Sequence, residues 1–331
     1  MNSILQPISS LKQQPGVPGV PSAKRARATT QTIVFVHGIR SSHETFEALA
    51  GKLRAKGIGA KFQFAYFDYS YRQSIAESGR QLAKALKENL SDLKTEVTIV
   101  GHSMGGLVGR LALLQQRHEM PFVKRLIMLG TPNHGTLHTG KLGLLMQLTR
   151  EVTGKIWSLT TKKTGVKELT EIDKLLNVHL NEETQKRTYS VEYVSIPATC
   201  FHEGAGWIEL MGLGASRGIG LAPLAMELFK ALPGWSVGLE KPHDGIVEES
   251  SVYLGNRGSV TRRSERRATC NKVPNCGSYV HVCHDDFRQE SHVTIQTADR
   301  TAAILAELFK SRTIAEWRSS NAGACDFVFE P

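Results

Sequence analysis

Short apolar runs alternate with longer amphipathic segments along much of the chain, a pattern that predicts strands alternating with helices. Apolar or alternating runs that predict strands occupy residues 32–36, 61–66, 97–100, 122–129, 191–196 and 279–283. Apolar residues at helical spacing occupy residues 46–53, 74–93, 107–114 and 297–308. The alternation predicts an α/β fold with a mostly parallel central sheet and helices on both faces.

Several segments do not fit this alternation. Residues 1–31 are rich in Pro, Gly, Ser and Gln and contain no acidic residue, so we expect a disordered basic tail. The α/β domain is expected over residues 32–312, and residues 313–331 are expected to be a polar tail.

Two insertions are predicted within the domain, at about 134–188 and 197–242, followed by a basic loop at 255–277. The second insertion contains an amphipathic helical pattern over 221–232, which would suit a cap or lid over an acyl-binding cleft or a helix packed on the core.

Composition narrows the functional class only a little. The chain has 331 residues and a formal charge of +10, and we find no run of about 18 apolar residues that could span a membrane. The charge would favour peripheral contact with an anionic membrane surface, whereas no nucleic-acid-binding signature accompanies it. No secretory signal is evident, so a cytoplasmic location is expected, although a basic, acid-poor N-terminus also suits an organelle transit segment.

The cysteines do not predict a disulfide framework or a metal site. There are five of them, an odd number in a long chain. The three that lie close together lack the short C-x₂₋₄-C spacing of structural zinc sites. We therefore expect ordinary thiols and neither a metal nor a cofactor. The cysteines are Cys200, Cys270, Cys276, Cys283 and Cys325.

Residues 101–105 read G-H-S-M-G and match the nucleophile-elbow pattern G-x-S-x-G. The pattern is short, but a predicted strand precedes it and a predicted helix follows it, as this motif requires. A sharp turn between the two elements would present the hydroxyl of Ser103 above the sheet, and its neighbours must be small. Ser103 is therefore the candidate nucleophile.

Three motifs together resemble those of the α/β-hydrolase lipases: V-H-G-I at 36–39, G-H-S-M-G-G at 101–106 and G-T-P-N-H-G at 130–135. The likeness covers about residues 32–308 apart from the two insertions. It implies that the backbone N–H groups of Ile39 and Met104 form the oxyanion hole. Two fixed amides that face a developing oxyanion stabilise it by about 3 kcal/mol each.

Other residues of these motifs are expected to support the site. His37 and His102 lie inside tight motifs, so each is expected to bond to the backbone and neither is the predicted base. Residues 131–133 are expected to shape the floor of the cleft beside Ser103.

The acid of such a triad follows the nucleophile in the chain and precedes the base. Residues 243–247 read H-D-G-I-V and resemble the acid turn of these lipases, which makes Asp244 the predicted acid. An Asp-Gly turn without a catalytic role is the alternative. Asp285 and Asp286 are rivals, but they follow the last predicted strand, where this fold does not place its acid.

His292 lies between the last predicted strand and the last predicted helix, where this fold presents its base. His284 is the rival, eight residues earlier at the end of the strand. His281 falls within the strand by alternation and is expected to have a structural environment.

These residues predict a serine hydrolase of the lipase or carboxylesterase type, acting on small-molecule or lipid esters. Thioesterase, amidase and acyltransferase activity are compatible with the same fold, as is a non-catalytic binding module. A distant alternative is an NAD(P)-binding oxidoreductase, because residues 214–220 read G-A-S-R-G-I-G. That motif lies too late in the chain to open a nucleotide-binding βαβ unit.

Overall fold

The computed structural model describes the segments 5–9, 31–39, 41–91, 95–116, 119–135, 191–198, 249–252, 279–281, 292–320 and 328–330, together with Asp244, Val247 and Glu290. Several predictions concern residues outside these segments. These residues are nearly all of both insertions, the basic loop at 255–277, the 214–220 motif, the five cysteines, and the alternative base His284 and alternative acids Asp285 and Asp286.

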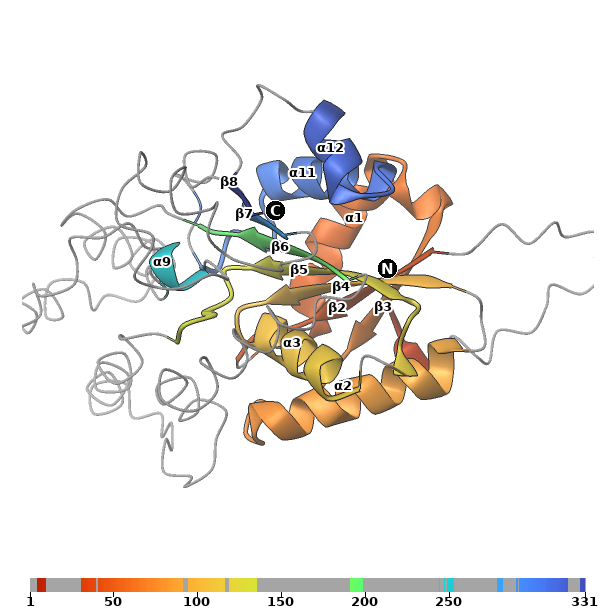
Figure 1. Cartoon of the computed structure of the whole chain (residues 1–331), viewed down its shortest axis with the longest axis vertical. Helices are drawn as coiled ribbons and strands as arrows, with labels where there is room; N and C mark the ends of the chain where they lie inside the picture. The colour runs from red at the N-terminus through yellow and green to blue at the C-terminus, as the bar shows by residue number, and fades with distance from the viewer. Residues whose placement is uncertain are drawn as a thin grey trace, which may run out of the picture.

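A central sheet organises the described residues (Figure 1). It has eight strands in the order β1-β3-β2-β4-β5-β6-β7-β8, and neighbours pair in parallel except β7 and β8. The strands are β1 Gln6–Pro7, β2 Gln31–Val36, β3 Phe62–Phe67, β4 Glu96–His102, β5 Val123–Leu129, β6 Glu192–Ile196, β7 Tyr279–His281 and β8 Val328–Glu330. Each strand predicted from the sequence is present, so the predicted α/β fold with a mostly parallel sheet is confirmed.

Helices cover both faces of the sheet. In Figure 1, α2 and α3 lie on one face, and α1, α11 and α12 lie on the other. The helices are α1 Glu47–Ala55, α2 Ile75–Leu90, α3 Met104–Gln116, α9 Glu249–Val252, α11 Asp299–Lys310 and α12 Ile314–Ser320. Two short 3₁₀ helices, η2 His43–Phe46 and η3 Ile58–Ala60, flank α1.

The continuous apolar strands explain this three-layer arrangement. In β2, Val34 and Val36 join the core beneath α2 and α3, whereas Ile33 and Phe35 join the core beneath α1 and α11. A strand that is apolar at successive positions must be buried on both faces. The sheet therefore needs a helical layer on each side.

Both predicted tails need correction. Residues 1–31 were expected to be disordered, but Gln31 begins β2, and Gln6–Pro7 pair with β3 beside the buried Leu5 and Ile8. Burial of these two apolar side chains docks the short segment beside the sheet, and the average composition of residues 1–31 does not reveal it.

At the other end, residues 313–331 were expected to form a polar tail, yet they contain α12 and β8. The side chains of Ile314 and Trp317 are buried, which fixes α12 against the core. Burial of these two apolar side chains stabilises a helix in a segment whose residues are mostly polar.

Candidate active site

Ser103 occupies a strained turn between β4 and α3. Its φ is 53°, and among the described residues it is the single non-glycine residue in this left-handed region. The flanking glycines are required by contact. A Cβ at Gly101 would lie 2.5 Å from the amide nitrogen of Gly106, and one at Gly105 would collide with the carbonyl oxygen of Val36. The local geometry is that of a nucleophile elbow.

His292 lies within hydrogen-bond distance of both Ser103 and Asp244. Its Nε2 is 2.8 Å from Ser103 Oγ, and its Nδ1 is 2.6 Å from Asp244 Oδ2. Because a carboxylate can only accept, Nδ1–H must donate to Asp244. That tautomer leaves the lone pair of Nε2 facing the serine hydroxyl, which then donates to it.

The carboxylate of Asp244 is held by its own turn. Its second oxygen, Oδ1, accepts the backbone N–H of Val247 at 2.6 Å. The backbone carbonyl of Asp244 accepts the N–H of His292 at 2.9 Å. Ser103, Asp244 and His292 are all buried. The structure thus brings together three side chains that the sequence separates by up to 189 positions.

His102 holds the backbone of His292 in place. Its Nε2–H donates to the backbone carbonyl of His292 at 2.8 Å. Burial, together with the nearby His292, lowers the pKa of His102 to about 3, so the ring is neutral. As expected from the sequence, His102 bonds to the backbone and is not in the position of the base.

The two predicted oxyanion donors flank Ser103. Met104 is the first residue of α3, where the helix N-terminus concentrates amide groups and positive dipole. Ile39 follows Gly38, which lies so close that a Cβ there would be 3.0 Å from the Cβ of Ser103. Both predicted donors are therefore on segments next to the serine.

The predicted floor residue Asn133 has a role that the sequence did not reveal. Its Oδ1 accepts from Arg110 Nη1 at 2.9 Å, and its Nδ2 donates to the carbonyl of Val252 at 2.7 Å. Asn133 thereby ties α3 to α9 beside the candidate site. The buried Arg110 was missed because a single arginine in an apolar helix pattern does not reveal its partner.

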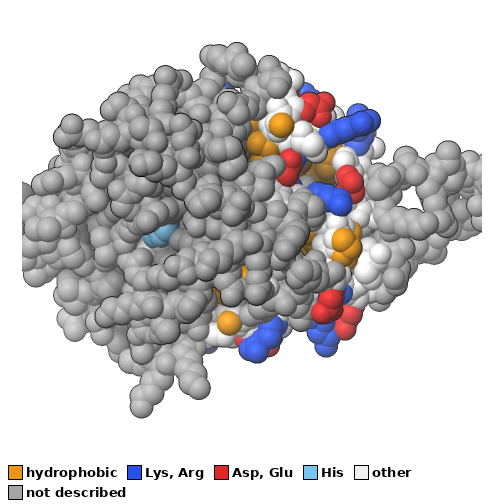
Figure 2. Space-filling model, in the orientation of Figure 1, with side chains coloured by type: hydrophobic (Ala, Val, Ile, Leu, Met, Phe, Trp, Pro, Cys, Tyr) orange, Lys and Arg blue, Asp and Glu red, His pale blue; other side chains and the backbone are white. Residues whose placement is uncertain are grey.

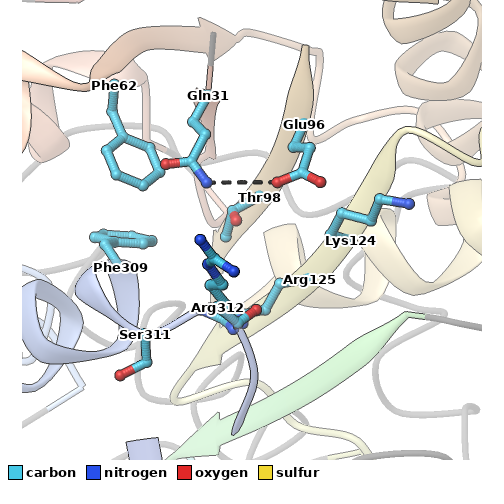
Figure 3. Close-up of a pocket in the computed structure, with 9 residues that line it drawn as sticks. All are labelled: Gln31, Phe62, Glu96, Thr98, Lys124, Arg125, Phe309, Ser311 and Arg312. Atoms are coloured by element: carbon cyan, nitrogen blue, oxygen red, sulfur yellow. Dashed lines mark hydrogen bonds between the residues drawn. The ribbon is translucent and has the colours of Figure 1, made fainter. Parts of the chain in front are cut away.

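A different hollow lies at the opposite edge of the sheet, where the strands begin (Figure 3). Arg125, at the start of β5, forms a short ion pair with Glu192 of β6, at 2.5 Å between Nη2 and Oε2. Arg125 Nη1 also donates to the carbonyl of Leu308 at 2.7 Å. The hollow is lined by Gln31, Phe62, Glu96, Thr98, Lys124, Arg125, Phe309, Ser311 and Arg312.

Figure 2 shows Lys and Arg side chains beside Asp and Glu side chains on the described part of this view. No helix among the described residues is both long and apolar enough to cross a bilayer.

Comparison with known proteins agrees with the fold. No protein of curated function matches the chain in sequence. The chain is similar in structure to the mature Bacillus licheniformis lipase BlEst2, with 17% identity, a TM-score of 0.51, and coverage of 89% of this chain and 97% of the lipase. It is also similar to phospholipase PlaB from Legionella pneumophila, with 14% identity, a TM-score of 0.55, and coverage of 88% of this chain and 62% of PlaB.

At such identities these likenesses establish the fold alone, which is the α/β-hydrolase fold of lipases and esterases. Residues 27–201, more than half of the chain, match a family of known sequences. The chain belongs to the family described as the PGAP1-like alpha/beta domain.

Proposed function

We propose that the chain is a serine hydrolase that cleaves carboxylic esters, with Ser103 as nucleophile, His292 as general base and Asp244 as the acid that orients it. One observation carries this proposal: His292 lies between Ser103 Oγ at 2.8 Å and Asp244 Oδ2 at 2.6 Å. A base within hydrogen-bond reach of a hydroxyl, itself oriented by a third group, activates that hydroxyl as a nucleophile.

The reaction would proceed in two halves. Nε2 of His292 takes the proton of Ser103 as Oγ attacks the acyl carbonyl, and Asp244 stabilises the imidazolium that forms. The N–H groups of Ile39 and Met104 stabilise the oxyanion. The imidazolium then donates its proton to the leaving alcohol. A water, activated by the same imidazole, releases the acid from the acyl-enzyme.

Burial of the three side chains supports this chemistry. In a site with little water, the electrostatic attraction between imidazolium and carboxylate is stronger than at a surface. The positive φ of Ser103 is also meaningful, because strained backbone persists where the surrounding structure enforces it, and such positions concentrate at active sites.

We propose esters with an acyl chain, lipid esters included, as the substrate class. Two of the proteins similar in structure are named a lipase and a phospholipase, enzymes that act on lipid esters. A cap or lid built from the insertions would complete an acyl site in this proposal.

A fluorophosphonate probe and a series of p-nitrophenyl esters of increasing chain length test the proposal together. The probe should label Ser103, and labelling should be absent in Ser103→Ala. Ester turnover should disappear in the same variant, while thioester and amide substrates show how far the activity extends. A wild-type protein that neither reacts with the probe nor hydrolyses any ester would refute the proposal.

A further inference from the structure

The ring of His37 bridges two backbone segments at the carboxyl end of β2. Its Nδ1 lies 2.7 Å from the carbonyl oxygen of Gly38, and its Nε2 lies 3.3 Å from the backbone nitrogen of Tyr69. A carbonyl can only accept and a backbone N–H can only donate. The ring must therefore be neutral, protonated on Nδ1 and an acceptor at Nε2.

The environment of His37 favours that neutral form. The side chain is buried, and this burial lowers the pKa of His37 below its usual value. Oδ1 of Asp68 lies 3.6 Å from Nε2 of His37. The same carboxylate also accepts hydrogen bonds from Nδ1–H of His43 at 2.5 Å and from the backbone N–H of His43 at 2.9 Å.

The partner of His37 belongs to a peptide group that matters for the reaction. The carbonyl of Gly38 and the N–H of Ile39 lie in one plane and point in opposite directions, because the peptide unit is planar and trans. A hydrogen bond that fixes the carbonyl therefore also fixes the direction of the N–H. It also polarises the amide, which makes the N–H a stronger donor.

Tyr69 makes three contacts with His37, two of them to the ring. The two rings stack at 4.4 Å between centroids with an interplanar angle of 12°. The phenol donates to the backbone carbonyl of His37 at 2.8 Å, and the backbone N–H of Tyr69 donates to the ring. Burial raises the pKa of the Tyr69 phenol, so it stays protonated and able to donate.

We propose that Tyr69 and His37 are positioning residues for the oxyanion hole: Tyr69 orients the His37 ring, and His37 orients the Gly38–Ile39 peptide toward the reacting carbonyl. The inference rests on the proposed function, because it assigns to Ile39 the donation of an oxyanion hydrogen bond. Gly38 is close enough for this role, since a Cβ there would touch both Ser103 and His102.

A pair of substitutions at His37 separates orientation from packing. The amide nitrogen of His37→Asn can occupy the place of Nδ1 and donate to Gly38, whereas that of His37→Gln reaches the place of Nε2 and leaves the carbonyl without its donor. We expect His37→Gln to lower kcat by about 10- to 100-fold, below the full loss of one oxyanion donor. His37→Asn should recover most of that loss.

Tyr69→Phe is the milder variant, since it keeps the ring and removes one hydrogen bond. We expect kcat to fall about 3- to 10-fold, in line with the loss of one neutral hydrogen bond. Tyr71→Phe is the matched control, because Tyr71 packs beside the same core as Tyr69, whereas the stacking and the hydrogen bonds to His37 described above come from Tyr69. It should leave kcat unchanged.

Three measurements on the full chain distinguish positioning from simple destabilisation. Titration with the fluorophosphonate probe counts folded, reactive sites, so that kcat refers to those sites alone. An arylboronic acid, which forms a tetrahedral adduct with the serine, should lose affinity by the same factor as kcat. KM for the ester should stay within about twofold, as expected when ground-state binding is retained.

Each outcome has a defined meaning. Wild-type kcat and boronic-acid affinity in both His37→Gln and Tyr69→Phe would overturn the inference. So would His37→Asn activity no better than that of His37→Gln, because packing alone would then explain the loss. A wild-type protein without ester turnover and probe labelling would instead overturn the proposed function, and the inference with it.

Discussion

The parallel strands begin at one edge of the sheet, the amino edge, and end at the opposite one, the carboxyl edge. Each of these edges contains a buried pair of one acidic and one basic side chain, but the groups around the two pairs differ. At the carboxyl edge, His292 and Asp244 face a hydroxyl on a strained backbone. At the amino edge, Arg125 and Glu192 face backbone groups of α11 and α12 (Figure 3 shows Arg125). Glu192 Oε1 accepts the N–H of Ile314 at 2.7 Å, so this pair fastens the last two helices to the sheet.

This difference in surroundings indicates that one buried pair has a structural role and that the other is suited to proton transfer. An arginine is always protonated, so Arg125 keeps its charge and can act only as a hydrogen-bond donor. The imidazole at the carboxyl edge can exist neutral or charged, and its Nε2 faces a group that can give it a proton. Substitutions at the two edges should therefore affect different properties.

The largest effect is expected at the carboxyl edge. Ser103→Ala should lower kcat/KM for p-nitrophenyl esters by at least about 10⁴-fold, because the nucleophile is lost while binding groups remain. The free energy of unfolding should change by less than about 1 kcal/mol, since only one hydroxyl is removed. Ester turnover measured per folded protein checks this. Turnover close to wild type would show that the two edges do not differ in the way described.

Glu192→Gln tests the amino edge. Arg125 and Glu192 have side chains only 6% and 13% exposed, so removing the carboxylate charge leaves a buried guanidinium without its counter-charge. We expect the free energy of unfolding to fall by about 3 kcal/mol. Urea unfolding measures this loss, and kcat/KM per probe-reactive site should remain at the wild-type level. A loss of kcat without a loss of stability would contradict a purely structural role.

The pH dependence of stability should report on His102, next to the carboxyl-edge pair. Its pKa is about 3 in the folded state against about 6.5 unfolded, so between these values the unfolded chain binds the extra proton. Stability is therefore fully present above pH 6.5 and declines as the pH falls toward 3. The contribution of His102 to the slope is up to about 1.4 kcal/mol per pH unit.

His102→Gln isolates this contribution. The amide nitrogen can still donate to the carbonyl of His292, but the side chain no longer titrates. Urea unfolding at several pH values from 6.5 downward should give a shallower decline for the variant than for wild type. Equal slopes would mean that His102 is protonated to the same extent in both states.

The smallest effect is expected at an exposed ion pair that belongs to neither edge of the sheet. Lys87 and Glu119 form a short ion pair at 2.6 Å, but their side chains are 28% and 62% exposed. Lys87→Met should change the free energy of unfolding by less than about 1 kcal/mol, because water and salt screen such pairs. A change as large as that of Glu192→Gln would show that burial is not what distinguishes the amino edge.

The sequence predicted the parts of the molecule that depend on local pattern. Apolar runs predicted the strands of the central sheet from β2 to β7, and the glycines around Ser103 predicted its strained turn because no larger residue fits there. Asp244 and His292 were predicted through a family resemblance, since spacing alone cannot say which carboxylate and imidazole meet.

Contacts between distant segments could not be predicted. The Arg125–Glu192 pair joins residues 67 positions apart, and nothing in either flanking sequence identifies the other partner. The tautomer of His37 depends on Tyr69, 32 positions away, whose ring lies alongside it only after β2 and β3 have paired. β1 and β8 were missed because two or three residues carry no readable periodicity.

The outermost strands have a practical consequence. β1 and β8 come from near the two ends of the described chain and cover the free sides of β3 and β7. Trimming either end to shorten the protein would uncover backbone amides and carbonyls that a second molecule could pair with, a known route to aggregation. Expression of this protein should therefore keep both termini, with any purification tag joined through a linker.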